Sequence, residues 1–128
     1  MFEINMTINE QLRNARDLKP FIESLEVELV QVRKQFKSQP ALLAPQETEI
    51  LTAIREITAR RQYMADLINQ LSDEKQRKIL TLQYIEGVKT KHLVEASGLK
   101  DDREVSSIRQ KAIKNLEKLL IKIEQPET

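Results

Sequence analysis

The sequence is poor in the residues on which most catalytic and metal sites depend. It contains no cysteine and no tryptophan, and His92 is its single histidine. These absences exclude disulfides, thiolate nucleophiles and multi-histidine metal sites. The HExxH, GxSxG, GxxxxGK[ST] and GxGxxG motifs are missing as well. We therefore expect no metal, no cofactor and no enzymatic activity.

Glycine and long apolar runs are also scarce. Two glycines in 128 residues leave little material for the turns of a sheet protein, and 32% charged against 40% hydrophobic residues is typical of amphipathic helices, so an all-α fold is predicted. Apolar runs such as Ala41 to Ala44 are far shorter than the roughly twenty residues that cross a bilayer. Met1 to Asn5 lacks the pattern of a signal peptide. We expect no membrane association and a cytoplasmic location.

The net charge of +1 conceals an uneven distribution. Residues 1–71 contain 9 basic and 10 acidic side chains, whereas residues 72–128 contain 12 and 10. Within Val105 to Lys122 the single acid is Glu117, and the basic residues are Arg109, Lys111, Lys114, Lys118 and Lys122. A local basic stripe in a nearly neutral chain indicates one defined charged face.

Residues 1–71 have the pattern of a helical arm. Thr7 and Glu10 form a capping box, which predicts a short helix from about Ile8 to Lys19 that ends or restarts at Pro20. Two heptad seams follow. The first is Leu18, Ile22, Leu25, Leu29, Val32 and Phe36, and the second is Ile50, Ile54, Ile57, Arg61, Met64, Ile68 and Leu71.

A loop of about nine residues, Ser38 to Gln46, separates the two seams and contains Pro40 and Pro45. The simplest arrangement is a coiled-coil-like antiparallel hairpin. Either the seams bury only each other, or the hairpin also pairs with a second copy, which predicts a homodimer. Arg61 interrupts the second seam, and either an ion pair that fixes the register or a snorkelling side chain would explain it.

Residues 72–128 form a second predicted domain of three helices. Ser72 and the acids after it start a helix that ends at Gly87, and Thr90 caps a short helix, Lys91 to Ser97, that ends at Gly98. Asp101 and Glu104 form another capping box before the last helix. The first helix has the apolar residues Ile79, Leu80, Leu82, Tyr84 and Ile85, and the last has Val105, Ile108, Ala112, Leu116, Leu119 and Ile123.

The last two helices and the glycine turn between them have the outline of a helix-turn-helix. At about 100° per residue, the face opposite the apolar stripe of the last helix carries Arg103, Ser107, Lys111, Lys114 and Lys118. An ordinary solvated face would explain these charges, and so would a DNA contact. In the second case Lys89, Lys91, Lys111 and Lys114 would hold phosphates, and Arg103, Ser106, Ser107 and Gln110 would read bases.

The segment Leu71 to Leu120 carries a set of motifs that points to one family. They are Leu-Ser-Asp-Glu at 71–74, Leu82 to Gly87, Leu93 with Gly98, and then Val105, Ile108, Ala112 and Leu116. This segment resembles region 4 of sigma-70-type transcription factors, and with its arm the chain is similar to phage regulators of the ArpU and RinA type. The resemblance implies that Lys91 to Ser97 supports a recognition helix. It also implies DNA contacts at Asp102, Arg103, Glu104, Ser106 and Ser107.

The resemblance predicts a sequence-specific DNA-binding transcription regulator, encoded by a phage or prophage, with double-stranded DNA and RNA polymerase as partners. The chain departs from the family pattern by one extra residue between Gly98 and Val105 and by acids or serines where sigma factors often have arginine. A sigma mimic that binds RNA polymerase or a host factor is therefore one alternative. A DNA-packaging or architectural protein is another.

Overall fold

A computed structural model describes residues 7–124 and confirms the all-helical prediction. The α-helices are α1 (Ile8–Gln35), α2 (Pro40–Asn69), α3 (Glu74–Leu80), α4 (Leu93–Ser97) and α5 (Asp102–Glu124). A π-helical segment, η1 (Thr81–Ile85), continues α3, and a 3-10 turn, η2 (Thr90–His92), precedes α4. No strand occurs among these residues. Met1 to Asn5, the segment weighed as a signal peptide, lies outside them.

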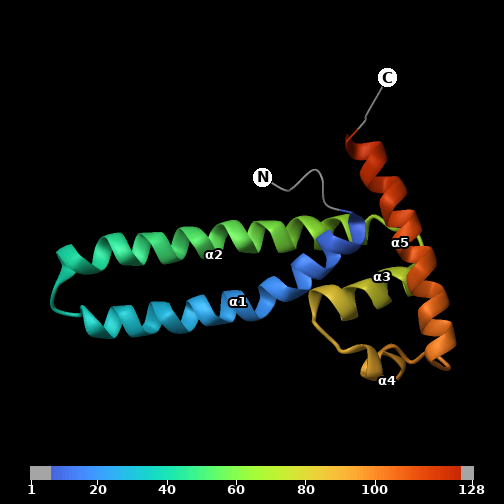
Figure 1. The fold of residues 1–128 in the computed structure, drawn as a ribbon, viewed down its shortest axis with the longest axis horizontal. Coiled ribbons are helices and arrows are strands. Elements are labelled where there is room, and N and C mark those ends of the chain that lie inside the picture. Colours follow the sequence, from blue (N-terminus) through green and yellow to red (C-terminus); the bar gives the residue numbers. More distant parts are fainter. Residues whose placement is uncertain (1–6, 125–128) are drawn as a thin grey trace.

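The two long helices, α1 and α2, lie side by side in opposite directions and form an extended arm (Figure 1). The predicted break at Pro20 is wrong, because this proline lies inside α1. A proline removes one helical hydrogen bond, but packing along an amphipathic face supplies most of a helix's stability and outweighs that loss. A proline is a known cause of a helix bend, and α1 is bent in Figure 1.

The turn between α1 and α2 is much shorter than the predicted loop of nine residues. It spans Phe36 to Gln39, and α2 begins at Pro40. Proline suits the first helical position because its missing N–H would have no helical acceptor there. Pro45 lies inside α2 and removes only one hydrogen bond. The two prolines therefore shape the start of a helix, where the sequence predicted an irregular loop.

The largest hydrophobic core joins the arm to the C-terminal helices. It contains residues from both sides of Leu71, namely Ile8, Leu12, Ala15, Met64, Leu67, Ile68, Leu71, Leu80, Tyr84, Ala112, Leu116 and Leu120. A separate cluster of Leu29, Val32 and Ile50 closes the distal arm. A third cluster, Ile79, Leu93 and Val105, holds α3, α4 and α5 together. The base of the arm thus packs directly against α5.

Arg61 adds a polar link between the same parts. Its Nε donates a hydrogen bond to the carbonyl of Ala15 in α1 at 3.0 Å, and its Nη2 donates to the carbonyl of Ile85 at the end of η1. The side chain is part-buried. It therefore bonds to the backbone of two other elements, a role that neither sequence-based explanation included.

The starts of the C-terminal helices depend on residues close in sequence. The cap of α3 is Asp73, whose side chain accepts from the Gln76 N–H at 2.9 Å, and the predicted hydroxyl of Ser72 is not the cap. Thr90 makes no cap either, since its hydroxyl accepts from Gln83. The helix predicted over Lys91 to Ser97 is therefore a 3-10 turn followed by α4.

Both glycines adopt the left-handed conformation that ends a helix, as predicted. Gly87 follows η1 with a φ of +79°, and Gly98 ends α4 with a φ of +75°. Four residues, Gly98 to Asp101, then turn the chain into α5. Only glycine adopts this conformation readily, so the two glycines fix the path of the chain into and out of α4.

The last helix, α5, crosses the base of the arm (Figure 1). Its predicted cap is present, because Asp101 Oδ1 accepts from the Glu104 N–H at 2.9 Å. Val105, Ala112 and Leu116 are buried as expected. Ile123 was predicted to be buried, but it is 43% exposed, and Leu120 is buried in its place. The end of α5 extends beyond the core that the described residues form, which leaves Ile123 exposed.

Candidate nucleic-acid interface

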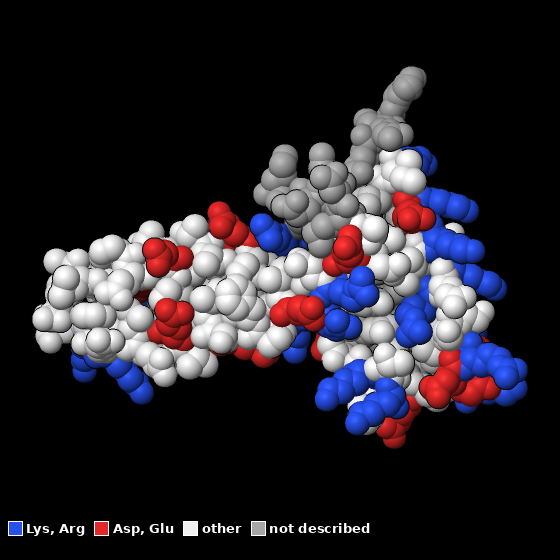
Figure 2. Space-filling model, viewed as in Figure 1, with Lys and Arg blue, Asp and Glu red and all other residues white. Residues whose placement is uncertain are grey.

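One face of α5 is basic and open to solvent. Its exposed basic side chains are Arg103, Lys111, Lys114, Lys118 and Lys122. The apolar residues of the opposite face are buried against the arm and α3. In Figure 2 the basic side chains line the edge of the molecule formed by α5, at the end farthest from the tip of the arm. The helix therefore presents cations outward because its other face is occupied by the core.

A shallow groove brings part of this face together with two lysines from other elements. Arg103, Ser107 and Lys111 of α5 line it together with Lys75 of α3 and Lys100 of the turn before α5. The groove has a volume of about 530 Å³, and Asp101, Glu104 and Ile108 complete its lining. Lys100 was not among the predicted site residues. It precedes α5 by two residues, so the helical period from which the stripe was identified does not include it.

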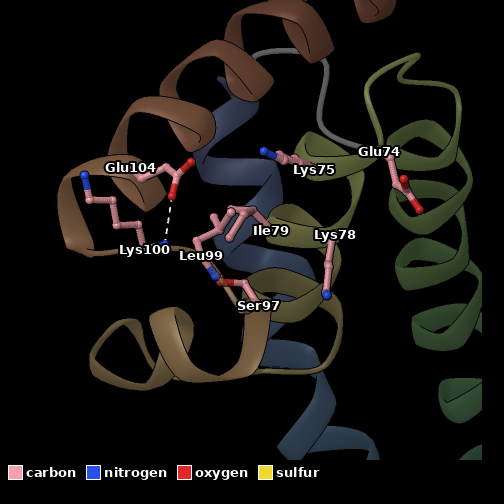
Figure 3. Close-up of a pocket in the computed structure, with 9 residues that line it drawn as sticks. Glu74, Lys75, Lys78, Ile79, Ser97, Leu99, Lys100 and Glu104 are labelled. Carbon is pink, nitrogen blue, oxygen red and sulfur yellow. Dashed lines mark hydrogen bonds between the residues drawn. The ribbon is translucent and has the colours of Figure 1, made fainter.

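A second cavity, of about 490 Å³, lies between α3, the Gly98 turn and the start of α5 (Figure 3). It shares Lys75, Lys100 and Glu104 with the groove on α5 and adds Lys78 and Ser97. Lys75 points from α3 toward α5 in Figure 3. The two hollows are therefore neighbours with a common wall, and lysines from two elements surround them.

The acids at the start of α5 are largely occupied by helix capping. Asp101 accepts from the Glu104 N–H, and the Glu104 carboxylate accepts from the Lys100 N–H at 2.8 Å (Figure 3). Negative charge at this position also stabilises the positive end of the helix dipole. Asp102 is exposed. Two of the three acids at the start of α5, Asp101 and Glu104, thus have a structural role.

Buried amides hold α5 at a fixed angle to the rest of the domain. Asn115 Nδ2 donates to Gln76 Oε1 of α3 at 3.0 Å. Arg109 Nη1 donates to Gln83 Oε1 at 3.3 Å, and Gln83 Nε2 donates to the Thr90 hydroxyl at 3.3 Å. Both glutamines are buried. Arg109, which the sequence grouped with the basic stripe, therefore faces inward and supports the helix.

The predicted DNA-binding residues lie on two different parts of the surface. Arg103, Ser107 and Lys111 share the groove on α5, and Gln110 and Lys114 are exposed on the same helix. Ser106 is half-buried. Lys89 lines another groove, of about 560 Å³, between the loop after Gly87 and residues such as Arg16 and Lys19 of α1. Lys91 is exposed on η2. The structure thus groups the α5 residues and separates Lys89 from them.

Comparisons with known proteins give no family to which the chain can be assigned. No protein-family model, curated protein or solved structure matches the sequence or the fold. Between residues 7 and 124 no cluster of three or more His, Asp or Glu side chains could hold a metal ion. No helix in that range is long and apolar enough to span a membrane. Any functional assignment therefore depends on the geometry and charge of the surface itself.

Proposed function

We propose that the chain binds double-stranded DNA through the exposed face of α5 and regulates transcription. The observation that carries the proposal is a row of exposed basic side chains along that face, from Arg103 to Lys122. The opposite face of the same helix is buried in the core. Lys and Arg side chains neutralise phosphates and supply most of the affinity of such contacts. The predicted residues Arg103, Ser107 and Gln110 lie toward the start of α5, the part of a recognition helix that reads bases.

In this proposal α4, the turn at Gly98 and α5 act as a helix-turn-helix. Leu93 of α4 and Val105 of α5 pack together with Ile79 of α3, which supports a fixed angle between the two helices. We add Lys75 and Lys100 to the proposed phosphate contacts Lys111 and Lys114, because both line the groove on α5 together with Lys111. Lys89, Lys91 and Ser106 remain candidate contacts at the border of the interface. The resemblance to sigma region 4 that the motifs of Leu71 to Leu120 predict would give the same assignment of helices.

We extend the proposal to the setting on the resemblance to phage regulators of the ArpU and RinA type that the sequence predicts. We place the protein in the cytoplasm of a bacterial host, encoded by a phage or prophage, and without catalytic activity. RNA polymerase is the proposed protein partner, which the arm would contact. Pull-down of purified polymerase, with and without DNA, tests this part separately.

A protein-interaction module is the second candidate function. Asp102 is exposed beside Arg103, and the cavity in Figure 3 contains both acids and lysines, a mixture that suits a charged protein surface. If the wild-type protein retains polymerase in the pull-down but binds no duplex DNA in the anisotropy assay, the second candidate replaces the first.

The main test is the triple variant Arg103→Ala/Lys111→Ala/Lys114→Ala. Fluorescence anisotropy with duplex DNA measures affinity at several salt concentrations. Each phosphate contact contributes about 0.9 to the slope of log affinity against log salt, so loss of the two proposed phosphate contacts, Lys111 and Lys114, should lower the slope by roughly two. Loss of Arg103, a proposed base contact, should weaken binding further. The control, Arg13→Ala/Arg55→Ala/Arg60→Ala, removes the same charge from exposed positions of the arm. Equal affinity and slope for the α5 variant and the wild type would overturn the proposal.

A further inference from the structure

The outer surface of α1 carries a stripe of residues that the arm's own core does not use. Four members of the stripe, Glu23, Glu26, Val30 and Lys34, are spaced by three, four and four residues and so share one face of α1, and the fifth, Lys37, follows in the turn just after the helix. All five are exposed, whereas Leu29 and Val32 of the same helix are buried against α2. Val30 is 51% exposed and lies at the centre of the stripe.

The charges of this stripe are arranged symmetrically about Val30. Acids lie seven and four residues before it, and lysines lie four and seven residues after it. A second α1 helix that crosses antiparallel at Val30 would place Glu26 opposite Lys34 and Glu23 opposite Lys37, twice each by symmetry. In a parallel pair the same residues would face their own kind, and like charges repel. The pattern therefore complements itself in one orientation only.

The charged groups of the stripe are available for such a contact. Glu26, Lys34 and Lys37 make no ion pair or side-chain hydrogen bond with other residues between 7 and 124. Glu23 has only the Lys19 side chain, 3.7 Å away and exposed. Exposed pairs of this kind contribute little to stability, so Glu23 can exchange its partner at small cost.

An exposed apolar residue of α2 lies at the same level of the arm as Val30. Arg33 Nε donates to Glu47 Oε2 at 2.6 Å, and this bond sets the register of the antiparallel helices. Equal rise along both helices then brings Ile50 and Leu51 to the level of Val30. Ile50 is buried, but Leu51 is 36% exposed. Val30 and Leu51 are thus exposed apolar residues at the same level of the arm, and on α1 Val30 lies between the acidic half and the basic half of the stripe.

We propose that this face is a dimerisation surface and that its partner is a second copy of the chain, antiparallel about Val30. Such a contact is isologous, since each copy offers the same stripe with the same two charged halves. It extends from Glu23 to the turn after α1, about 20 Å of helix, which is small for a specific interface. The dimer is therefore reversible and depends on concentration. The proposal does not require DNA binding and can be tested without DNA.

Charge reversal tests the electrostatic part. In sedimentation equilibrium Glu23→Lys/Glu26→Lys, and separately Lys34→Glu/Lys37→Glu, should raise the dimer dissociation constant about tenfold or more, because all four ion pairs become repulsive. The quadruple variant regains complementarity and should dimerise within about threefold of the wild type. The control Glu49→Lys/Glu56→Lys makes the same charge change at exposed positions of α2 outside the stripe. A quadruple variant that is helical by circular dichroism but monomeric would overturn the proposal, as would a monomeric wild type.

Cysteine cross-linking tests the geometry, because the chain has no native thiol. Under mild oxidation Val30→Cys should form a disulfide-linked dimer, whereas Gln35→Cys, on the other side of α1, should not. A parallel pair would also link position 30, so the direction needs a second measurement. An equal mixture of Glu23→Cys and Lys37→Cys should give mainly the 23–37 disulfide. If only 23–23 and 37–37 disulfides form, the antiparallel arrangement is wrong.

Discussion

At the scale of single residues, the Arg61 side chain of α2 links three elements of the fold. It lies in the seam of α2, yet its guanidinium bonds to the carbonyls of Ala15 and Ile85 in two other elements. The Ile85 carbonyl ends a helical segment, where backbone acceptors lack a helical donor. Arg61 therefore satisfies the Ile85 carbonyl and adds a bond to the Ala15 carbonyl inside α1.

Replacement of Arg61 by alanine should lower the free energy of unfolding by about 2–4 kcal/mol, since a hydrogen bond from a charged donor contributes about 1.5–3 kcal/mol. Arg61→Lys should lose less, because an ammonium group can serve one of the two carbonyls. Urea denaturation measures both. The control is Arg60→Ala, an exposed neighbour, with an expected change within about 0.5 kcal/mol. Equal stabilities of the Arg60 and Arg61 variants would contradict this role.

Gly98 gives a second prediction at this scale, in which the cost is conformational. Its φ is +75°, and a Cβ added there would meet no atom within 4 Å. Gly98→Ala should therefore cost only the left-handed backbone penalty, about 1–2 kcal/mol. Gly98→Asn should cost less, because asparagine tolerates this conformation. Thermal denaturation separates the two, and an asparagine variant less stable than the alanine variant would show that space, not backbone, limits the position.

At the scale of helices, the start of α1 depends on a reciprocal capping box. Thr7 Oγ1 accepts from the Glu10 N–H at 3.1 Å, and the Glu10 carboxylate accepts from the Thr7 N–H at 2.9 Å. Hydrogen bonds from the Thr7 backbone and then from its side chain lower the pKa of Glu10 below its ordinary value of 4.5. The folded state thus favours the ionised carboxylate.

A lowered pKa makes this contribution depend on pH in one direction. The stabilisation is complete above pH 4.5, the ordinary value for the unfolded chain, and is lost as the pH falls through the lower value of the folded state. Glu10→Gln should therefore lower the Tm at pH 6 and have progressively less effect below pH 4.5. Thermal scans of both proteins measure this difference, and a difference that stays constant with pH would contradict it.

The same scale shows why some elements could be predicted from sequence and others could not. The caps at Thr7 and Asp101 involve partners three residues away, so a short motif reveals them. Pro20 and Pro45 led to wrong helix boundaries, because both lie inside helices. The hydrogen bond that a proline removes is outweighed by side-chain burial along the whole helix, and a short stretch of sequence does not reveal that burial. The Arg61 acceptors lie 46 and 24 residues away, and no pattern encodes that distance.

The candidate site divides in the same manner. The periodicity of α5 identified Arg103, Ser107 and Lys111 on one face, and these residues line a single groove. Lys75 and Lys100 join them only because α3 and the Gly98 turn pack beside α5. Arg109 was assigned to the basic stripe, but the buried amide of Gln83 draws it inward. The helical period thus predicts which residues of α5 share a face. The residues that other elements add to that face depend on tertiary packing.

At the scale of the whole molecule, the two proposed surfaces lie far apart. The basic edge of α5 is at the end of the molecule opposite the tip of the arm (Figure 2). The dimer stripe lies on the arm, around Val30. A two-fold axis at Val30 would place the basic edges at opposite ends of the dimer. The copies of Leu12 at the arm bases would be roughly 54 Å apart, at 1.5 Å per residue for eighteen residues on each side.

Such a dimer would hold two separate DNA segments, and we expect it to bridge them. In a capture assay, protein bound to DNA on a bead should retain a second, labelled duplex. The dimer-weakening variant Glu23→Lys/Glu26→Lys should lose most of this capture while it still binds a single duplex in anisotropy, because its α5 face is unchanged. The quadruple charge-reversed variant should recover bridging, which separates loss of the dimer from loss of the fold. Capture of the second duplex by the dimer-weakening variant at wild-type levels would contradict the arrangement, since bridging would then not depend on the arm.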